Sequence, residues 1–595
     1  MNIHANNKSV LSCFKSPVVC ALLLFVVLTL AGCGSDPGDS EDMVVLRDAL
    51  VSKIRSLDPG DVSDTTSATV TGCFYETLYG FDYEARPYKL VPMLADSMPE
   101  ISDDRLTYTI KLKEGIKFSD SPCFPDGKGR ELKASDFVFA WKRIANIKFR
   151  SKNWWMFDGR IVGLDAFREY TTEVGKGEEV DYSRPVEGFK AVDDHTLVIK
   201  LKKPWPQLPL VLAYLASAPV PPEAVDYYGE DIVSNPVGTG PFVLKHWQRG
   251  SYVEALKNPN FRTEYNPGAS RTAENKLPLA DKILFMVVEE SQPRWLQFKQ
   301  GDIDALTPPA DNFDQAIEIG HELTPQMKKN NIQLTTMDEP CTDWVALNME
   351  DPLIGGNKPL RLALAHAVDR KKYIELFTNN RDEPAYGFIP PVMKAYDPGI
   401  KEIGPHYDPD KAREYLEQAR EVQGGEIPTI TLTMGGTSSL HSKMGTLLER
   451  NFEAIGLDIE TEYLDWPIFL EKTHTKSAQI FQLGWRADYP DTETFLQVFY
   501  SKNESPGPNQ FNYSSPEFDR IYEEATMMPA GPERTELYRQ AERIVMEDCP
   551  MIPIKHRVMY SLYHDWLENY RLAAFDPGYG LRKYRSADMD KRKKF

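Results

Sequence analysis

The sequence predicts an α/β or α+β fold with mixed sheets, because strand patterns and helix patterns intermix along the chain. Strands are indicated where apolar and polar residues alternate, as in 106–112. Helices are indicated where apolar residues recur at a spacing of about 3.6 residues, as in 408–423. With 42% hydrophobic residues in 595, the chain has material for two or more hydrophobic cores.

The first half alternates strand and turn signals around one clear helix. That helix begins at Ala134-Ser135-Asp136 and places apolar side chains on one face. The other predicted elements, in order, are an apolar-rich segment at 44–50, a Pro-Gly turn at 56–60, strands at 106–112 and 196–201, and a Gly/Pro-rich turn at 235–242 that leads into a strand at 243–244.

The second half is richer in helical periodicity. Strands are expected between the helices, and an apolar alternating segment begins at 552–554. The predicted helices are 360–377, 408–423, 439–455 and 533–547, and the predicted strands are 430–434 and 480–484.

The N-terminal segment has the pattern of a secretory leader. Lys8 and Lys15 precede an apolar run at 18–30, which is too short to span a bilayer, since a spanning helix needs about 20 apolar residues. The run ends in Leu30-Ala31-Gly32-Cys33, which resembles the lipobox of bacterial lipoproteins, in which the cysteine is lipidated. An ordinary signal peptide with a coincidental cysteine is the alternative interpretation.

The segment after Cys33 is expected to be a flexible tether. Residues 34–42 carry no large apolar side chain and cannot join a core, and such a chain reaches about 15–18 Å. We therefore expect a signal peptide at 1–32 and a lipidated tether at 33–42. The body would lie on the extracytoplasmic side, either in the periplasm of a Gram-negative cell or on the outer face of the cell membrane.

Charge and cysteine content exclude several functions. The formal net charge of −19 becomes still more negative without the two leader lysines, which disfavours nucleic acid and anionic lipid as partners. The basic run 591–594 is predicted to be a solvated, frayed terminus. The four cysteines beyond the tether, whose pairing stays open, lie in no zinc-binding spacing, so no metal site is expected: Cys73, Cys123, Cys341 and Cys549.

Seven short motifs spread over the chain carry a family resemblance. They lie at 75–79, 90–95, 106–120, 134–143, 238–242, 361–370 and 484–491. In this order they resemble the family-five extracytoplasmic solute-binding proteins of peptide ABC transporters, the group that includes oligopeptide- and dipeptide-binding proteins. The resemblance covers essentially the whole mature chain.

The resemblance implies an α/β fold of the periplasmic-binding-protein-like type, a bilobal clamp of type II or cluster C. Two mixed α/β lobes would enclose the ligand, and lobe I would carry an extra subdomain. The implied boundaries place lobe I at 43–75, 188–340 and 556–595, its extra subdomain at 76–187, and lobe II at 341–555.

The implied function is that of a substrate-binding lipoprotein of a peptide ABC importer. It would capture oligopeptides and deliver them to the permease subunits, as a monomer that needs no cofactor and touches the membrane through its lipid anchor alone. Alternatives within the same fold are receptors for a dipeptide, haem, a nickel chelate or glutathione. An extracytoplasmic hydrolase is disfavoured, because the sequence has no His-Glu-x-x-His, Gly-x-Ser-x-Gly or phosphate-loop motif.

The resemblance also implies a peptide-binding site. Asp488 stands at the position of the aspartate that binds the peptide amine, and a charge-assisted hydrogen bond in a dry cleft stabilises by about 1.5–3 kcal/mol. Gly484 and Trp485 would offer a strand edge to the peptide backbone, and Ser63 and Thr65 the opposite edge. Further contacts are expected from two aromatic residues, Trp466 and Trp154.

The peptide carboxylate end departs from the family pattern. Positions that are basic in some oligopeptide binders hold Thr378, Thr473 and Gln482, and only His441 keeps a residue used near the peptide C-terminus. We expect Arg486 or Arg557 to compensate. A disulfide that some members form between the strand of Cys341 and the position of Arg486 cannot form here.

Overall fold

The computed structural model describes residues 43–595, apart from 86–87, 176–177, 319 and 576–579. The predicted leader, the tether and Cys33 lie outside the described residues. Within the described part, no helix is both long and apolar enough to cross a membrane.

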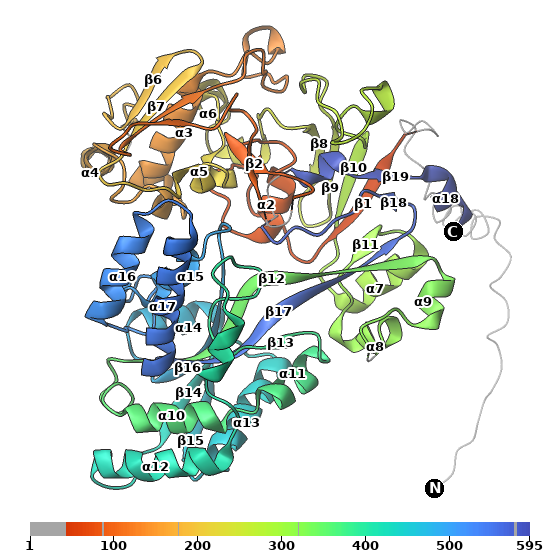
Figure 1. The fold of residues 1–595 in the computed structure, drawn as a ribbon. Helices are drawn as coiled ribbons and strands as arrows, with labels where there is room; N and C mark the ends of the chain where they lie inside the picture. Colours follow the sequence, from red (N-terminus) through yellow and green to blue (C-terminus); the bar gives the residue numbers. More distant parts are fainter. Residues whose placement is uncertain (1–42, 86–87, 176–177, 319, 576–579) are drawn as a thin grey trace, which may run out of the picture. The chain divides into compact units, whose positions relative to one another are not determined.

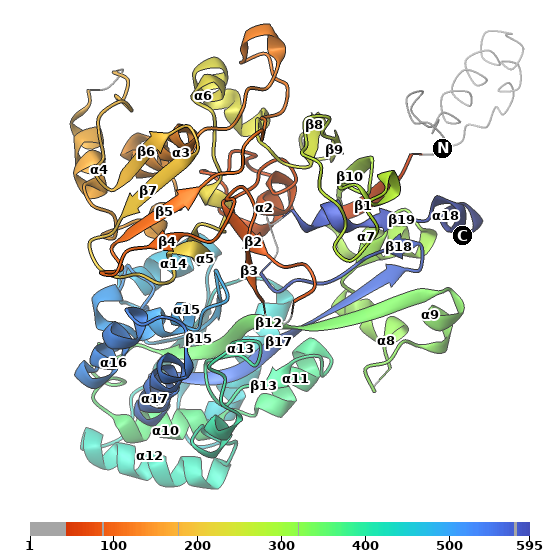
Figure 2. The ribbon, with the colours of Figure 1, turned by 45° about the horizontal axis from the view of Figure 1, so that its top comes forward.

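Three sheets carry most of the described fold (Figures 1 and 2). The first has the order β1–β10–β9–β8 and the second, entirely antiparallel, the order β4–β5–β7–β6. The third is mixed, with the order β11–β17–β12–β16–β14–β15, and β13 pairs with β17 at its side.

The strands have the following bounds. They are β1 (Val45–Leu50), β2 (Tyr79–Phe81), β3 (Leu90–Pro92), β4 (Glu100–Ile101), β5 (Thr107–Lys111), β6 (Phe189–Asp193), β7 (Thr196–Lys200), β8 (Phe242–Gln248), β9 (Tyr252–Lys257), β10 (Lys282–Val287), β11 (Ala305–Leu306), β12 (Ile332–Leu347), β13 (Glu383–Pro384), β14 (Ile430–Met434), β15 (Ile459–Tyr463), β16 (Ile480–Arg486), β17 (Met551–His564), β18 (Leu567–Glu568) and β19 (Ser586–Ala587).

The helices lie between these strands, and many begin at a side-chain cap. Asp408 and Ser515, for example, each accept a hydrogen bond from a backbone N–H of the first turn. The helices are α2 (Thr65–Thr71), α3 (Ala134–Ala145), α4 (Leu164–Glu173), α5 (Leu208–Val211), α6 (Pro222–Tyr228), α7 (Ser291–Gln300), α8 (Phe313–Ala316), α9 (Pro325–Lys329), α10 (Lys358–Ala367), α11 (Arg370–Thr378), α12 (Pro409–Gln423), α13 (Ser439–Glu453), α14 (Trp466–His474), α15 (Glu493–Leu496), α16 (Pro516–Thr526), α17 (Pro532–Asp548) and α18 (Met589–Lys594).

Two long strands connect separate hydrophobic clusters. β12 and β17 run antiparallel and side by side in both views (Figures 1 and 2). Ile332 near the start of β12 packs with Trp295 and Phe298, whereas Val345 near its end packs with the core under α10, α12 and α13. Their pairing shifts register between Asp338 and Thr342, which is where the expected boundary between the lobes crosses β12.

The predicted single helix at 360–377 is wrong. The structure has two helices, α10 and α11, which are separated at Val368 and Asp369. Val368 is extended, with ψ of 113°, and the Asp369 side chain accepts a hydrogen bond from the Lys372 N–H. A new N-cap inside an uninterrupted apolar pattern therefore divides the segment.

The prediction of a frayed basic terminus is also wrong. Residues 589–594 form α18, and Asp588 caps its first turn through the N–H groups of Asp590 and Lys591. The side chain of Arg592 is only 7% exposed: its guanidinium pairs with the Asp304 carboxylate and donates to the Val45 carbonyl at 2.6 Å. This long-range ion pair fixes the end of the chain against β1.

Three of the four cysteines beyond the predicted tether form no disulfide bond. Cys123, Cys341 and Cys549 carry free thiols in the structure. The Cys73 thiol donates to the Thr69 carbonyl at 3.7 Å. Burial raises the pKa of the Cys341 thiol to about 12 and that of Cys549 to about 11, which keeps both thiols protonated and unreactive at neutral pH.

Candidate functional site

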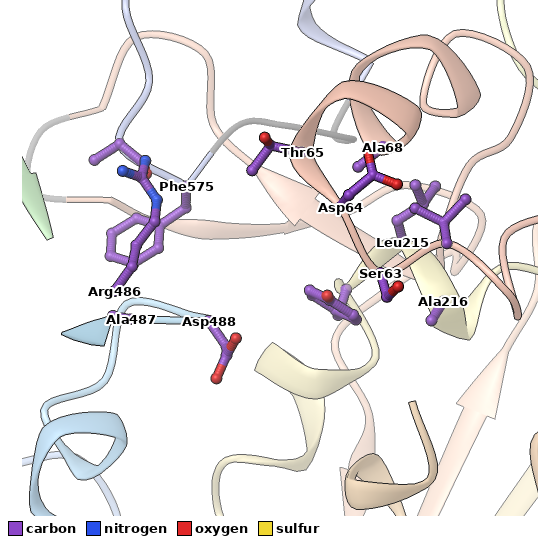
Figure 3. Close-up of a pocket in the computed structure, with 13 residues that line it drawn as sticks. Ser63, Asp64, Thr65, Ala68, Leu215, Ala216, Arg486, Ala487, Asp488 and Phe575 are labelled. Atoms are coloured by element: carbon purple, nitrogen blue, oxygen red, sulfur yellow. The ribbon is translucent and has the colours of Figure 1, made fainter. Parts of the chain in front are cut away.

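A cavity of about 190 Å³ lies between segments that are distant in the sequence (Figure 3). One wall comes from the start of α2 and the loop before it, and from residues 214–216. The other comes from the end of β16 and from 574–575. Segments expected in lobe I and in lobe II therefore face the same cavity. Its lining residues are Val62, Ser63, Asp64, Thr65, Ala68, Tyr214, Leu215, Ala216, Arg486, Ala487, Asp488, Ala574 and Phe575.

Asp488 is the distinctive group of this cavity (Figure 3). It follows the last residue of β16 by two positions and is half-buried. No described residue forms a hydrogen bond or ion pair with its carboxylate. Because burial disfavours the charged form, the pKa of Asp488 is raised to about 7. The cavity thus holds a carboxylate that lacks a cation of its own.

Tyr214 belongs to the opposite wall of the cavity and lies close enough to the Asp488 carboxylate to be affected by its charge. Burial raises the pKa of the Tyr214 phenol, and the Asp488 charge raises it further. The ring of Trp155 meets that of Tyr214 edge to face, with centroids 5.6 Å apart. Trp155 is 39% exposed, so this aromatic pair extends the wall toward solvent.

The edge of β16 next to the cavity is open to backbone pairing. β16 pairs with β12 along its length, from Ile480 to Arg486. On its other side β14 pairs only with Ile480 and Phe481. In the described part of the chain no strand pairs with this second edge over 482–486, which leaves backbone donors and acceptors available for an added strand.

Position 484 on this edge requires a glycine, because the side chain of Asp343 occupies the space that a Cβ would need. A Cβ at Gly484 would lie 2.2 Å from Asp343 Oδ1. Asp343 is held there by Lys555 Nζ at 2.9 Å and Arg557 Nη2 at 2.7 Å. The neighbouring Trp485 is half-buried and packs against the large core, and its indole N–H finds no acceptor among the described residues.

Arg486 lines the cavity but is already engaged. Its Nη1 lies 2.6 Å from Glu339 Oε2, and its Nη2 donates to the Ala574 carbonyl at 2.8 Å. In the register of β12 and β16, Cys341 lies directly opposite Arg486. The guanidinium therefore ties β16 to β12 at the place where some family members were expected to have a disulfide. Arg557 instead pairs with Asp343 and does not line the cavity.

The structure brings four of the predicted site residues together in this cavity: Asp488, Arg486, Ser63 and Thr65. Ser63 and Thr65 flank Asp64, whose Oδ1 accepts from the Ser67 N–H at 2.8 Å and so caps α2. The predicted residues Gly484, Trp485, Trp466, His441 and Trp154 do not line it.

The three predicted side chains on other elements have local contacts. Trp466 begins α14, is 51% exposed and stacks on Phe469 at 5.2 Å. His441 on α13 hydrogen-bonds Ser438 Oγ at 2.8 Å. The Arg168 guanidinium lies over the ring of Trp154 at 4.6 Å.

Sequence reasoning missed the aromatic wall. Tyr214 and Phe575 line the cavity but belong to no motif, and nothing in their local sequence marks them. The pair Trp154-Trp155 is visible in the sequence, but only the 3₁₀ turn at Trp154–Met156 decides that Trp155 is the residue next to Tyr214.

The family model of the bacterial extracellular solute-binding proteins, family 5 Middle, matches residues 89–507. The chain belongs to this family. Its fold is the bilobal α/β clamp of periplasmic binding proteins, as expected. Proteins of this family bind solutes for transport rather than catalyse reactions.

Family-five relatives with different named ligands match nearly the whole chain. The oligopeptide-binding protein OppA of Bacillus subtilis is 25% identical over 96% of this chain and 98% of its own. The glutathione-binding protein GsiB of Escherichia coli K12 is 28% identical over 87% and 89%. The solved structure of DppA from Helicobacter pylori, in complex with the peptide STSA, is 24% identical over 91% and 98%, with a TM-score of 0.70, and supports the fold.

Among the described residues, no group of three or more His, Cys, Asp or Glu side chains is arranged to hold a metal ion.

Proposed function

We propose that this family-five protein is the peptide-binding lipoprotein of an ABC importer. Cys33 would carry the lipid anchor, oligopeptides would bind between the lobes, and the closed clamp would deliver them to the permease as a monomer. The observation that carries the proposal is Asp488, a half-buried carboxylate in the cavity with no partner among the described residues.

A peptide amine suits this carboxylate. An ammonium group would replace the missing cation, lower the pKa of Asp488 again and form charge-assisted hydrogen bonds. The open edge of β16 at 482–486 then runs away from Asp488, in position to pair with the peptide backbone. Backbone pairing recognises a peptide without reading its side chains.

The far end of the peptide would be held without a dedicated cation. Thr378 and Thr473 donate to the carbonyls of Ile374 and Leu470 within their own helices. Gln482 hydrogen-bonds the Tyr373 hydroxyl. Arg486 and Arg557 are also engaged by carboxylates, so neither of these two described cations is free to select one length of peptide by its C-terminal charge. This favours oligopeptides of several lengths over a single zwitterion such as glutathione.

Native mass spectrometry of residues 34–595, purified without denaturation, tests the proposal. We expect a ladder of bound peptide masses. A single non-peptide mass, such as haem or a chelate, would contradict the proposed ligand. Protein that elutes empty is titrated with tetra-alanine and N-acetyl-tetra-alanine; the free-amine peptide should bind and the acetylated peptide should bind far more weakly.

A further inference from the structure

Two polar contacts join the expected lobe I to residues that follow Asp488 in the sequence. Arg160, from the expected extra subdomain of lobe I, reaches Glu493 at the start of α15. Gln207, also from the expected lobe I, reaches α16 and α17. Helices α15–α17 can be followed in Figures 1 and 2. Arg160 contacts the segment that continues directly from Asp488, and Gln207 is linked to it through Arg534, which pairs with Asp491.

Arg160 is held in place by residues of another part of the expected lobe I, 188–340. Its guanidinium lies over the ring of Trp205 at 4.2 Å, and its carbonyl accepts from the Lys202 N–H at 2.9 Å. From there Arg160 Nη2 lies 3.8 Å from Glu493 Oε1. The side chain is 38% exposed, so solvent can reach the cation but not its partner.

Glu493 is buried, with 2% of its side chain exposed. Its carboxylate accepts hydrogen bonds from the Tyr489 hydroxyl at 2.8 Å and the Tyr522 hydroxyl at 3.2 Å. Burial and the nearby Asp491 raise the pKa of Glu493, and Arg160 opposes both. Within the described part of the chain, Arg160 is the one cation within ion-pair distance of this carboxylate.

The hydrogen bonds of Glu493 are linked to Asp488 through neighbouring residues. Tyr489, which hydrogen-bonds Glu493, is the next residue after Asp488. Asp491 pairs with Arg534. With its amide oriented to satisfy both neighbours, Gln207 accepts from Arg534 Nη1 at 3.0 Å and donates to the Thr526 carbonyl at 3.2 Å. In the turn from 488 to 493, Glu493 is thus linked to the expected lobe I directly through Arg160, and Asp491 through Arg534 and Gln207.

We propose that Arg160 is a cross-lobe positioning residue: through Glu493 and Tyr489 it fixes the Asp488 turn when the lobes are closed. Lobe closure and binding at Asp488 then reinforce each other, because each needs the same turn in the same place. The inference rests on the proposed function for the identity of the ligand, but not for the contact between the lobes.

The test compares R160Q, E493Q and the double variant with the parent. Arg184→Gln is the matched control, because Arg184 lies in the same expected subdomain over an aromatic ring, Tyr170, at 4.3 Å. Among the described residues, no ion pair or hydrogen bond joins its side chain to the expected lobe II. With tetra-alanine as the probe, we expect R160Q and E493Q to raise the dissociation rate about fivefold, and the double variant to add nothing further. R160K should restore part of the loss, because it keeps the charge.

Small-angle X-ray scattering of the ligand-free proteins separates this inference from the proposed function. R160Q should show a larger radius of gyration than the parent, and R184Q the parent's value. If tetra-alanine does not bind the parent, the proposed ligand is wrong, while the scattering still decides the positioning role. Parental scattering and a parental dissociation rate in R160Q, or equal effects in R184Q, would overturn the inference.

Discussion

Two carboxylates of the expected lobe II, Asp343 and Asp488, show how burial acts on the same group with and without a cation beside it. Asp343 on β12 is buried, yet Lys555 and Arg557 hold its pKa below the usual value despite the cost of burial. Asp488, just beyond β16, has no such cation, and burial raises its pKa to about 7. The difference lies in the neighbours: a carboxylate supplied with its own cations stabilises the fold, whereas one left without them can receive a cation from outside.

Asp343→Asn should have the largest effect on stability. It leaves Arg557 without its carboxylate and Lys555 with Asp382 alone, so we expect a loss of about 3–5 kcal/mol in the free energy of unfolding. Urea unfolding followed by circular dichroism measures it. A loss below about 1 kcal/mol would show that the Asp343 network is not structural.

Asp488→Asn should give the opposite pattern. We expect free-amine peptides to bind about 2–5 kcal/mol more weakly, because one partner of a buried charge pair is removed. The free energy of unfolding should be unchanged or higher, since a desolvated carboxylate is lost.

The matched control for this variant is Asp64→Asn. Asp64 lines the same cavity, but it caps α2, a position where asparagine serves as well. Tetra-alanine affinities from calorimetry should fall in Asp488→Asn and stay near the parent in Asp64→Asn. Equal affinities in all three proteins would remove Asp488 from the site.

Gly484→Ala should have the smallest effect, and it links the two regions. The new Cβ would displace the Asp343 carboxylate from its place beside Arg557, at a cost of about 1–3 kcal/mol in stability. Thermal unfolding at neutral pH measures the loss. If the variant keeps parental stability and a crystal structure shows Asp343 unmoved, the close approach does not constrain this edge.

Much of the fold follows from local patterns in the sequence. The strand at 430–434 was predicted with its observed bounds because its apolar residues are bounded by clear breaks. The break between α10 and α11 was missed because the apolar spacing continues through it, and only the Asp369 cap marks a new start. The docking of Arg592 was missed because its partner, Asp304, is distant in the sequence.

The site was predictable only in part. Asp488, Ser63 and Thr65 were predicted through the family resemblance, and Arg486 as a cation that compensates for a departure from the family pattern; all four line the cavity. The pairing of Arg486 with Glu339 and the presence of Tyr214 in the wall depend on how strands and loops meet in space. Neither contact leaves a periodic or spaced signal in the chain.

The most direct test of Asp488 as the group that receives the peptide amine is the proton released when a peptide binds. At pH 6 a carboxylate with a pKa of about 7 is mostly protonated, and an ammonium partner favours its charged form, so binding must expel the proton. Calorimetric titration of the parent with tetra-alanine, in buffers of different ionisation enthalpy, should show release of nearly one proton per peptide. Affinity should rise by about tenfold per unit from pH 5 toward pH 7.

Asp488→Asn should release no such proton and should lose this pH dependence. Binding by the parent with no proton release at pH 6, or the same release in Asp488→Asn, would contradict the assignment of Asp488 as the group that receives the peptide amine.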